Sequence, residues 1–95
     1  MLIDSIRHKA LRRFAGTGST KGLPSGSLER LRNMLTYLAV MAAEEELHVL
    51  PNFGAHRLTG DRKDEWALTV TRNWRMTFRI NEAGAIEDMD LEDYH

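Results

Sequence analysis

Cysteine is absent from the 95-residue chain, and so are long apolar runs. Without cysteine there is neither a disulfide framework nor a thiolate metal site. No apolar run approaches the roughly 20 residues that span a bilayer. Near the N-terminus, Asp4 and Arg7 interrupt an apolar stretch that is too short for a signal peptide. We therefore expect a cytoplasmic protein with no membrane segment.

Recognisable catalytic motifs are also missing. The sequence has no glycine-rich phosphate-binding loop, no pair of histidines at metal-ligand spacing and no nucleophile elbow. Its histidines, at positions 8, 48, 56 and 95, are too scattered to indicate a zinc site. The composition is ordinary for a globular protein, with 42% hydrophobic and 28% charged residues. A chain of this length has room for one core, so we expect a single domain over residues 1–95.

Lysine and arginine are unevenly distributed. The net charge is only −1, but between residues 7 and 32 the bases outnumber a single acid. From residue 80 onward there are six acids and neither lysine nor arginine. This distribution predicts a basic face opposite an acidic edge. The alternative is a scattered, solvated surface with no partner.

Two segments have helical periodicity. Residues 9–15 form the first, and Gly16 is suited to its C-cap. Over residues 28–42, apolar residues recur every three or four positions, which predicts an amphipathic helix that begins near Ser25 or Ser27. Its stripe comprises Leu28, Leu31, Leu35, Leu38 and Ala42, flanked by Met34 and Met41. We interpret this stripe as core.

The remaining pattern is that of strands. Strands are predicted at residues 55–59, 65–71, 74–80 and 85–91, and residues 2–6 suit a first strand. Successive hairpins make an antiparallel meander. Because the two helices must cover one face of the sheet, the predicted fold class is α+β: two N-terminal helices packed on one face of a small, mainly antiparallel β-sheet.

Residues 74–80 alternate between apolar and polar side chains. The apolar set should face the helices, and Arg75 and Arg79 should project from the opposite face of the sheet. His56 lies in a neighbouring strand region, and a guanidinium offers donors matched to phosphate. A face that carries arginine and histidine suits a phosphate. The alternative is a solvated strand face on which arginine provides only solubility.

The sequence ends with a carboxylate, a phenol and an imidazole, on Asp93, Tyr94 and His95. These residues follow directly after the last predicted strand, which would carry them on an ordered element. Histidine gives or takes a proton near neutral pH. Tyrosine donates a hydrogen bond or stacks on a base, and aspartate orients either neighbour. The alternative is a disordered tail, because disorder concentrates at termini.

Several separated motifs together resemble the HigB-type toxins of the RelE superfamily. The family pattern is a His-x-Leu-x-Gly-x-Arg stretch, a tryptophan strand, an Asn-Trp-Arg turn and an Asp-Tyr-His end. The matching positions here are residues 56–62, Trp66, residues 73–75 and residues 93–95. Residues 7–14 and 17–20 also resemble the family. The similarity covers nearly the whole chain in order.

The resemblance implies a RelE-like fold and an mRNA interferase, a bacterial toxin that cuts mRNA in the A site of the 70S ribosome and inhibits translation. The implied partner is a HigA-type antitoxin with a helix-turn-helix domain, and operator DNA would be bound only through the toxin–antitoxin complex. The family mechanism needs no metal, and we expect no cofactor. The ribose 2′-hydroxyl attacks the adjacent phosphate, which leaves a 2′,3′-cyclic phosphate and a 5′-hydroxyl.

This chemistry needs a base for the 2′-hydroxyl proton, a cation for the phosphorane charge and an acid for the leaving oxygen. We expect Arg75 to stabilise the charge and His95 to act as acid or base, with Tyr94 assisting and Asp93 orienting its neighbours. His56 is a further acid–base or phosphate candidate. The expected contacts to RNA and the ribosome are Arg57, Arg62, Lys63 and Arg79.

One position departs from the family. Some members carry a catalytic lysine where this chain has Thr59, and Arg57 or Arg62 would have to supply that charge, although neither position is equivalent. Two alternatives stay open. A ParE-like inhibitor of DNA gyrase would share the fold without nuclease chemistry. A non-catalytic module would use its arginines only to bind an acidic antitoxin.

Overall fold

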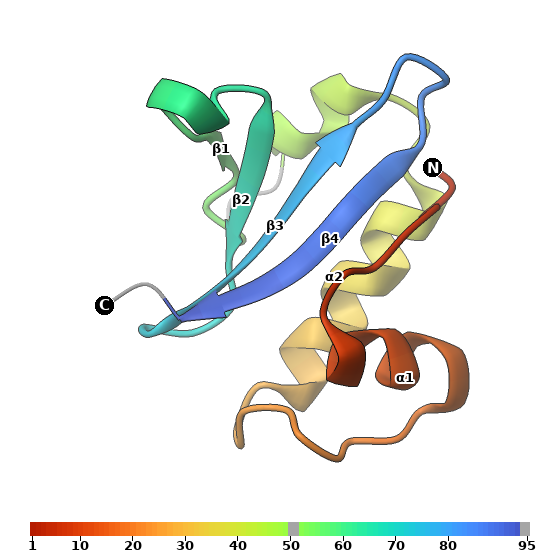
Figure 1. Cartoon of the computed structure of the whole chain (residues 1–95). Coiled ribbons are helices and arrows are strands. Elements are labelled where there is room, and N and C mark those ends of the chain that lie inside the picture. The colour runs from red at the N-terminus through yellow and green to blue at the C-terminus, as the bar shows by residue number, and fades with distance from the viewer. Residues whose placement is uncertain (50–51, 94–95) are drawn as a thin grey trace.

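Two helices precede a four-stranded sheet in the structure, a computed structural model that describes residues 1–49 and 52–93 (Figure 1). The helical elements are α1 (Lys9–Thr17), α2 (Leu28–Val40) and the 3₁₀ helices η1 (Glu44–Val49) and η2 (Gly60–Arg62). The strands are β1 (His56–Arg57), β2 (Glu65–Thr69), β3 (Trp74–Ile80) and β4 (Ile86–Asp93). Within the described ranges, no helix is long and apolar enough to cross a bilayer.

The sheet is a meander. Its strands lie in the order β1-β2-β3-β4, and every neighbouring pair is antiparallel. The N-terminal segment runs beside β4 in the same direction, joined to it by two isolated bridges from Ile3 to Ile86 and from Ile6 to Met89 (Figure 1). The predicted first strand is thus reduced to two bridges, and the prediction of a mainly antiparallel sheet is confirmed.

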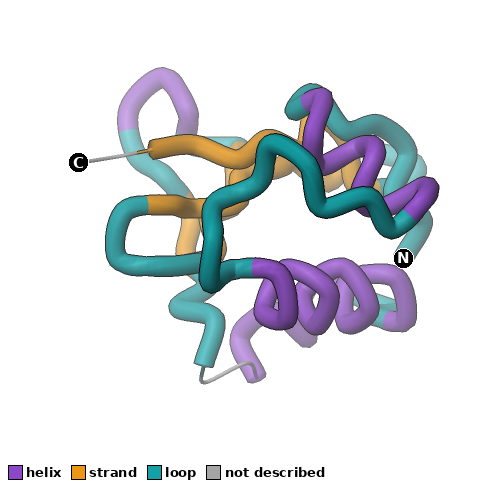
Figure 2. The backbone as a smooth tube through the Cα atoms, turned by 90° about the horizontal axis from the view of Figure 1, so that it is seen from below, coloured by secondary structure: helices purple, strands orange, loops and turns teal. Residues whose placement is uncertain are grey.

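The hydrophobic core lies between the helices and one face of the sheet. In the view from below, α2 runs along one side of the strands (Figure 2). Leu31, Met34 and Leu38 of α2 are fully buried, as are Met76 and Phe78 of β3. Burial of such side chains contributes roughly 1.5–3 kcal/mol each. The predicted α+β class is confirmed, with the helices on the apolar face as expected.

The boundaries of both helices differ in detail from the prediction. Gly16 was expected to cap α1, but it lies inside the helix, and the cap is Gly18. Gly18 has a φ of 79° and donates its N–H to the carbonyl of Phe14, a left-handed conformation that glycine adopts at no steric cost. The buried residues of α2 are Leu31, Met34 and Leu38. The predicted stripe is therefore only partly correct, because Leu35 is partly buried and Ala42 lies beyond the helix and is exposed.

Candidate active site

The face of the sheet turned away from α1 and α2, called the open face below, carries the polar residues of β2, β3 and β4. Antiparallel partners project to the same side of a sheet. Arg75 is paired with Glu92 and Thr69, and in the next row Thr77 is paired with Ala67, which in turn is paired with His56. The register therefore brings His56 and Arg75 to the same face, separated by roughly 10 Å across the strands and roughly 7 Å along them.

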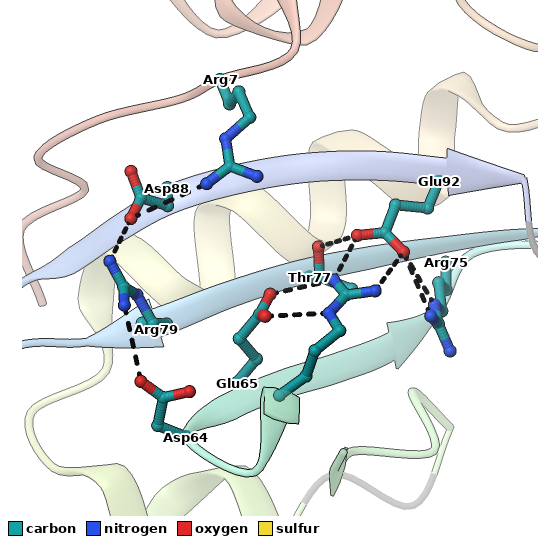
Figure 3. Close-up of polar contacts among 9 residues, drawn as sticks. Arg7, Asp64, Glu65, Arg75, Thr77, Arg79, Asp88 and Glu92 are labelled. Carbon is teal, nitrogen blue, oxygen red and sulfur yellow. Dashed lines mark hydrogen bonds and ion pairs between the residues drawn. The ribbon is translucent and has the colours of Figure 1, made fainter. Parts of the chain in front are cut away.

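Arg75 is bound to a carboxylate on that face. Its Nε and Nη2 atoms donate to Oε1 of Glu92 at 3.3 and 3.1 Å. The side chain of Arg75 is 23% exposed. Thr77 donates its hydroxyl to the second oxygen of Glu92 at 2.9 Å. Figure 3 shows these three side chains together on the strands, with a helix behind the sheet. Charge-assisted bonds of this kind fix the direction of the guanidinium.

Arg62 joins the same cluster from η2. Its Nε and Nη2 atoms bind the two carboxylate oxygens of Glu65 at 2.8 and 2.9 Å. Its Nη1 donates to Oε1 of Glu92 at 3.0 Å, and its Nη2 also reaches that carboxylate. These contacts tie η2 across β2 and β3 to the end of β4. They also explain why Thr77 is buried, although it lies on the open face.

The cluster comprises two arginines and two glutamates. Hydrogen bonds from Arg62, and then from Thr77 and Arg75, lower the pKa of Glu92 to about 2, against the raising effect of burial. The pKa of the Arg62 guanidinium is raised above its ordinary value, first by Glu65 and then by Glu92. Glu92 is therefore ionised throughout the physiological range, and Arg62, Arg75 and Thr77 all donate hydrogen bonds to it. It is a structural anion rather than a proton donor.

The pKa of Glu92 predicts an acid-labile contribution to stability. A carboxyl whose pKa is lower in the folded than in the unfolded state stabilises above the unfolded value and loses that effect as pH falls toward the folded one. We expect Glu92→Gln to cost on the order of 1–2 kcal/mol at pH 7 after allowance for solvent screening. The difference between wild type and variant should shrink between about pH 4.5 and pH 2. Urea unfolding at pH 7 and pH 3 measures it, and a constant difference would contradict the assignment.

His56 is exposed at the edge of the sheet, and one contact defines its tautomer. Its Nδ1 lies 2.8 Å from the carbonyl oxygen of Gly54. A carbonyl only accepts hydrogen bonds, so Nδ1 carries the hydrogen when this bond forms. The lone pair of the neutral ring is then on Nε2. This arrangement suits a general base.

A pocket of about 550 Å³ adjoins His56 at the β1 edge. Its lining consists of Glu44, Glu45, His48, Ala55, His56, Arg57 and Trp66. Glutamates on the wall disfavour a phosphate, whereas imidazole and carboxylate groups can meet the polar edge of a base. The pocket therefore suits a nucleobase better than a backbone phosphate.

The other predicted RNA contacts are dispersed. Arg57 lies on the opposite side of the sheet from His56, with its guanidinium 5.2 Å from the Trp66 ring centroid and 2.6 Å from Glu44. Lys63 is exposed at the end of η2. Arg79 is on the open face but at the far end of β3, where it binds Asp88 and approaches Asp64 (Figure 3). Only Arg62 lies in the cluster with Arg75.

The C-terminal group is described in part. Asp93 is exposed at the end of β4, in register with Trp74, so its side chain leaves the sheet on the face opposite to that of its neighbour Glu92 and of Arg75. Tyr94 and His95 lie outside the described residues, so their predicted roles stay predictions.

Sequence reasoning assigned no role to Glu92, Glu65 or Thr77. A signal for Glu92 was available, because the apolar residues Met89 and Leu91 place position 92 off the core face together with Arg75. No comparable signal identified Glu65, since its partner Arg62 reaches it from a 3₁₀ turn.

Comparisons with known proteins identify the family. A family model described as the RelE-like toxin of the type II toxin–antitoxin system HigB matches residues 4–95. This chain belongs to the HigB-like toxin family. It is 33% identical over 94 residues to Endoribonuclease HigB of Proteus vulgaris, covering 99% of this chain and 100% of that protein. The solution structure of a conserved hypothetical protein, HP0892 from Helicobacter pylori, matches with a TM-score of 0.51 and 18% identity over 99% of this chain and 96% of that one.

The structural similarity to HP0892 concerns the fold alone, since the identity is low. Family membership confirms the resemblance to HigB-type toxins of the RelE superfamily. Full-length homology to an endoribonuclease supports the predicted class of enzyme. A type II toxin also implies an antitoxin partner, as expected from the sequence.

Proposed function

We propose that this HigB-like toxin is a ribosome-dependent endoribonuclease that cuts mRNA in the A site and so inhibits translation. The observation that carries the proposal is the register of the open face, which sets Arg75 on the same side as His56 and next to the strand that ends at Asp93. Full-length homology to a named endoribonuclease supports the same reaction class. An activity on translated mRNA belongs in the cytoplasm.

The proposed reaction is metal-independent. A base removes the 2′-hydroxyl proton, a bond forms between the 2′-oxygen and phosphorus, and the bond from phosphorus to the 5′-oxygen breaks as that oxygen is protonated. The products are a 2′,3′-cyclic phosphate and a 5′-hydroxyl. Arg75 stabilises the charge on the phosphorane, because an anchored cation acts most strongly where charge develops.

Proton transfer is assigned to the histidines. His95 is the proposed acid or base, Tyr94 stacks or donates a hydrogen bond, and Asp93 orients them. His56, with Nε2 as its basic atom, is the second candidate.

The proposed RNA contacts differ in how they are held. Lys63 is exposed, and Arg79 is placed to meet a phosphate only after exchanging Asp88. Arg57 would have to leave Glu44 and the Trp66 ring. Thr59 is exposed at the start of η2 and supplies no charge where some relatives have lysine. We therefore expect Arg75 to carry more of the phosphate binding here than in those relatives.

The proposed partner is a HigA-type antitoxin with a helix-turn-helix domain, which would bring the toxin to operator DNA. The acidic residues of the final strand offer it a charged surface.

Primer-extension mapping of cleavage on translated mRNA tests the function. Wild-type protein should produce cuts within translated codons, and His95→Ala should lower cleavage by about 100-fold or more, as expected for a lost proton-transfer group. Equal cutting of naked RNA would contradict ribosome dependence. Inhibition of gyrase supercoiling without mRNA cuts would favour the ParE-like alternative, and growth that continues on expression would favour a non-catalytic module.

A further inference from the structure

We propose that Arg62 is a positioning residue that acts through Glu92 to keep the positive charge of Arg75 available to the scissile phosphate. This inference rests on the proposed function. It assigns Arg62 a role inside the protein instead of the direct RNA contact that its charge suggests.

The geometry shows one carboxylate shared by two guanidiniums. Oε1 of Glu92 accepts from Arg62 at 3.0 Å and from Arg75 at 3.1 Å, and the Thr77 hydroxyl holds the other oxygen. Arg62 directs Nε, Nη1 and Nη2 at carboxylates. With its donors directed at Glu65 and Glu92, Arg62 is arranged to act on Glu92 rather than on a ligand.

The charge balance gives this arrangement a consequence. With Arg62 present, the two arginines and two glutamates of the cluster carry no net charge, and the carboxylate of Glu92 binds both guanidiniums. Without Arg62, Glu65 and Glu92 would both remain charged. Arg75 would be left as the arginine bonded to Glu92, and Glu65 would keep its cross-strand neighbour Arg79 at the far end of β3. A phosphate that approaches Arg75 would then meet a net negative cluster, and like charges at this range in a partly buried site are strongly disfavoured. Arg62 thus offsets an acid that would otherwise compete with the substrate.

A double-mutant cycle on ribosome-bound mRNA tests the coupling. Arg62→Gln should lower kcat/KM at least about tenfold, mainly through a higher KM, because the phosphate is repelled in the ground state as well as the transition state. Glu92→Gln removes the competing charge but keeps an oxygen that accepts a hydrogen bond from Arg75, so it should keep at least half the wild-type value. The double variant should recover to within about threefold of Glu92→Gln. Equal effects of Arg62→Gln in both backgrounds would overturn the proposal, since they would indicate a direct RNA contact or a purely structural role.

Stability measurements separate this role from packing. Both substitutions remove bonds from one cluster, so Glu92→Gln should lower the melting temperature as Arg62→Gln does, while only Arg62→Gln should lose activity. Arg62→Lys retains the charge and should keep most of the activity. It also provides the comparison if Arg62→Gln fails to fold. A loss of activity in Arg62→Lys as large as that expected for Arg62→Gln would contradict the charge argument. Arg13→Ala removes the same charge from exposed α1 and controls for net charge.

An Arg75→Ala variant in the same assay distinguishes two kinds of failure. If Arg75→Ala cuts normally, the proposed active site is wrong. If Arg75→Ala is inactive but Arg62 and Glu92 show no coupling, only the positioning role is wrong.

Discussion

Arg75→Ala is expected to lower the rate of mRNA cleavage by about 100- to 1,000-fold while the protein remains folded. Removal of one preorganised donor to a developing oxyanion typically has an effect of this size. The fold should survive because Arg75 projects from the face of β3 opposite the core, and Glu92 keeps its bonds to Arg62 and Thr77. Single-turnover cleavage on programmed ribosomes measures the chemical step, and circular dichroism melting measures the fold.

Two further variants sharpen the Arg75 prediction. Arg75→Lys keeps the charge but loses the planar two-donor edge that matches a phosphate, so it should recover only part of the rate. Arg13→Ala changes the net charge by the same amount as Arg75→Ala, but Arg13 lies on α1, away from the open face. This variant should therefore cut at the wild-type rate. A folded Arg75→Ala protein with wild-type cleavage would remove this residue from the reaction.

The sequence predicted the faces of the sheet well where the alternation is strict. Residues 74–80 match the observed β3 (Trp74–Ile80) at both ends, and Arg75 and Arg79 lie on the face away from the helices as expected. Period-two patterns determine sidedness directly, because a shift of one residue would expose every apolar side chain. The pairing register of β1, β2 and β3 then places His56 on the same face as Arg75.

The register of β4 was harder to predict. Its apolar residues Ile86, Met89 and Leu91 are spaced by three and then by two, and the pairing shifts between Thr77 and Arg79. Asp88 has a φ of 56° at this irregularity. A regular hairpin would have placed Leu91 opposite Arg75. The extra residue instead puts Glu92 there, and with it the anion on which the cluster depends.

The partners of the arginines could not be predicted from local sequence. Arg57 pairs with Glu44 from 13 residues away, and Arg62 pairs with Glu92 from 30 residues away. Such pairs depend on where β1 and η2 cross the sheet, and no local periodicity encodes that crossing. Local sequence therefore identified the basic residues as a group of candidates but could not separate a candidate RNA contact from a residue that balances an acid.

Leu38→Ala is expected to destabilise the protein by about 2–5 kcal/mol, the range found when a fully buried leucine is truncated. Leu38 has no exposed surface and lies in the core cluster that α2 shares with the strands. Single domains are stable by only about 5–15 kcal/mol, so the loss would leave a large unfolded fraction in the cell. Urea unfolding measures the change, and the melting temperature should fall by roughly 4–8 °C for each kcal/mol.

Val40 provides a matched control on the same helix. It is an aliphatic residue two positions further on, but it is 75% exposed. Val40→Ala should change stability by no more than about 0.5 kcal/mol, as for other surface sites. Growth arrest should then weaken with Leu38→Ala and persist with Val40→Ala, although neither residue approaches the open face. If both substitutions lowered the free energy of unfolding equally, α2 would not pack through the side that carries Leu31, Met34 and Leu38. The helices that cover the core face of β3, opposite Arg75, would then need another orientation.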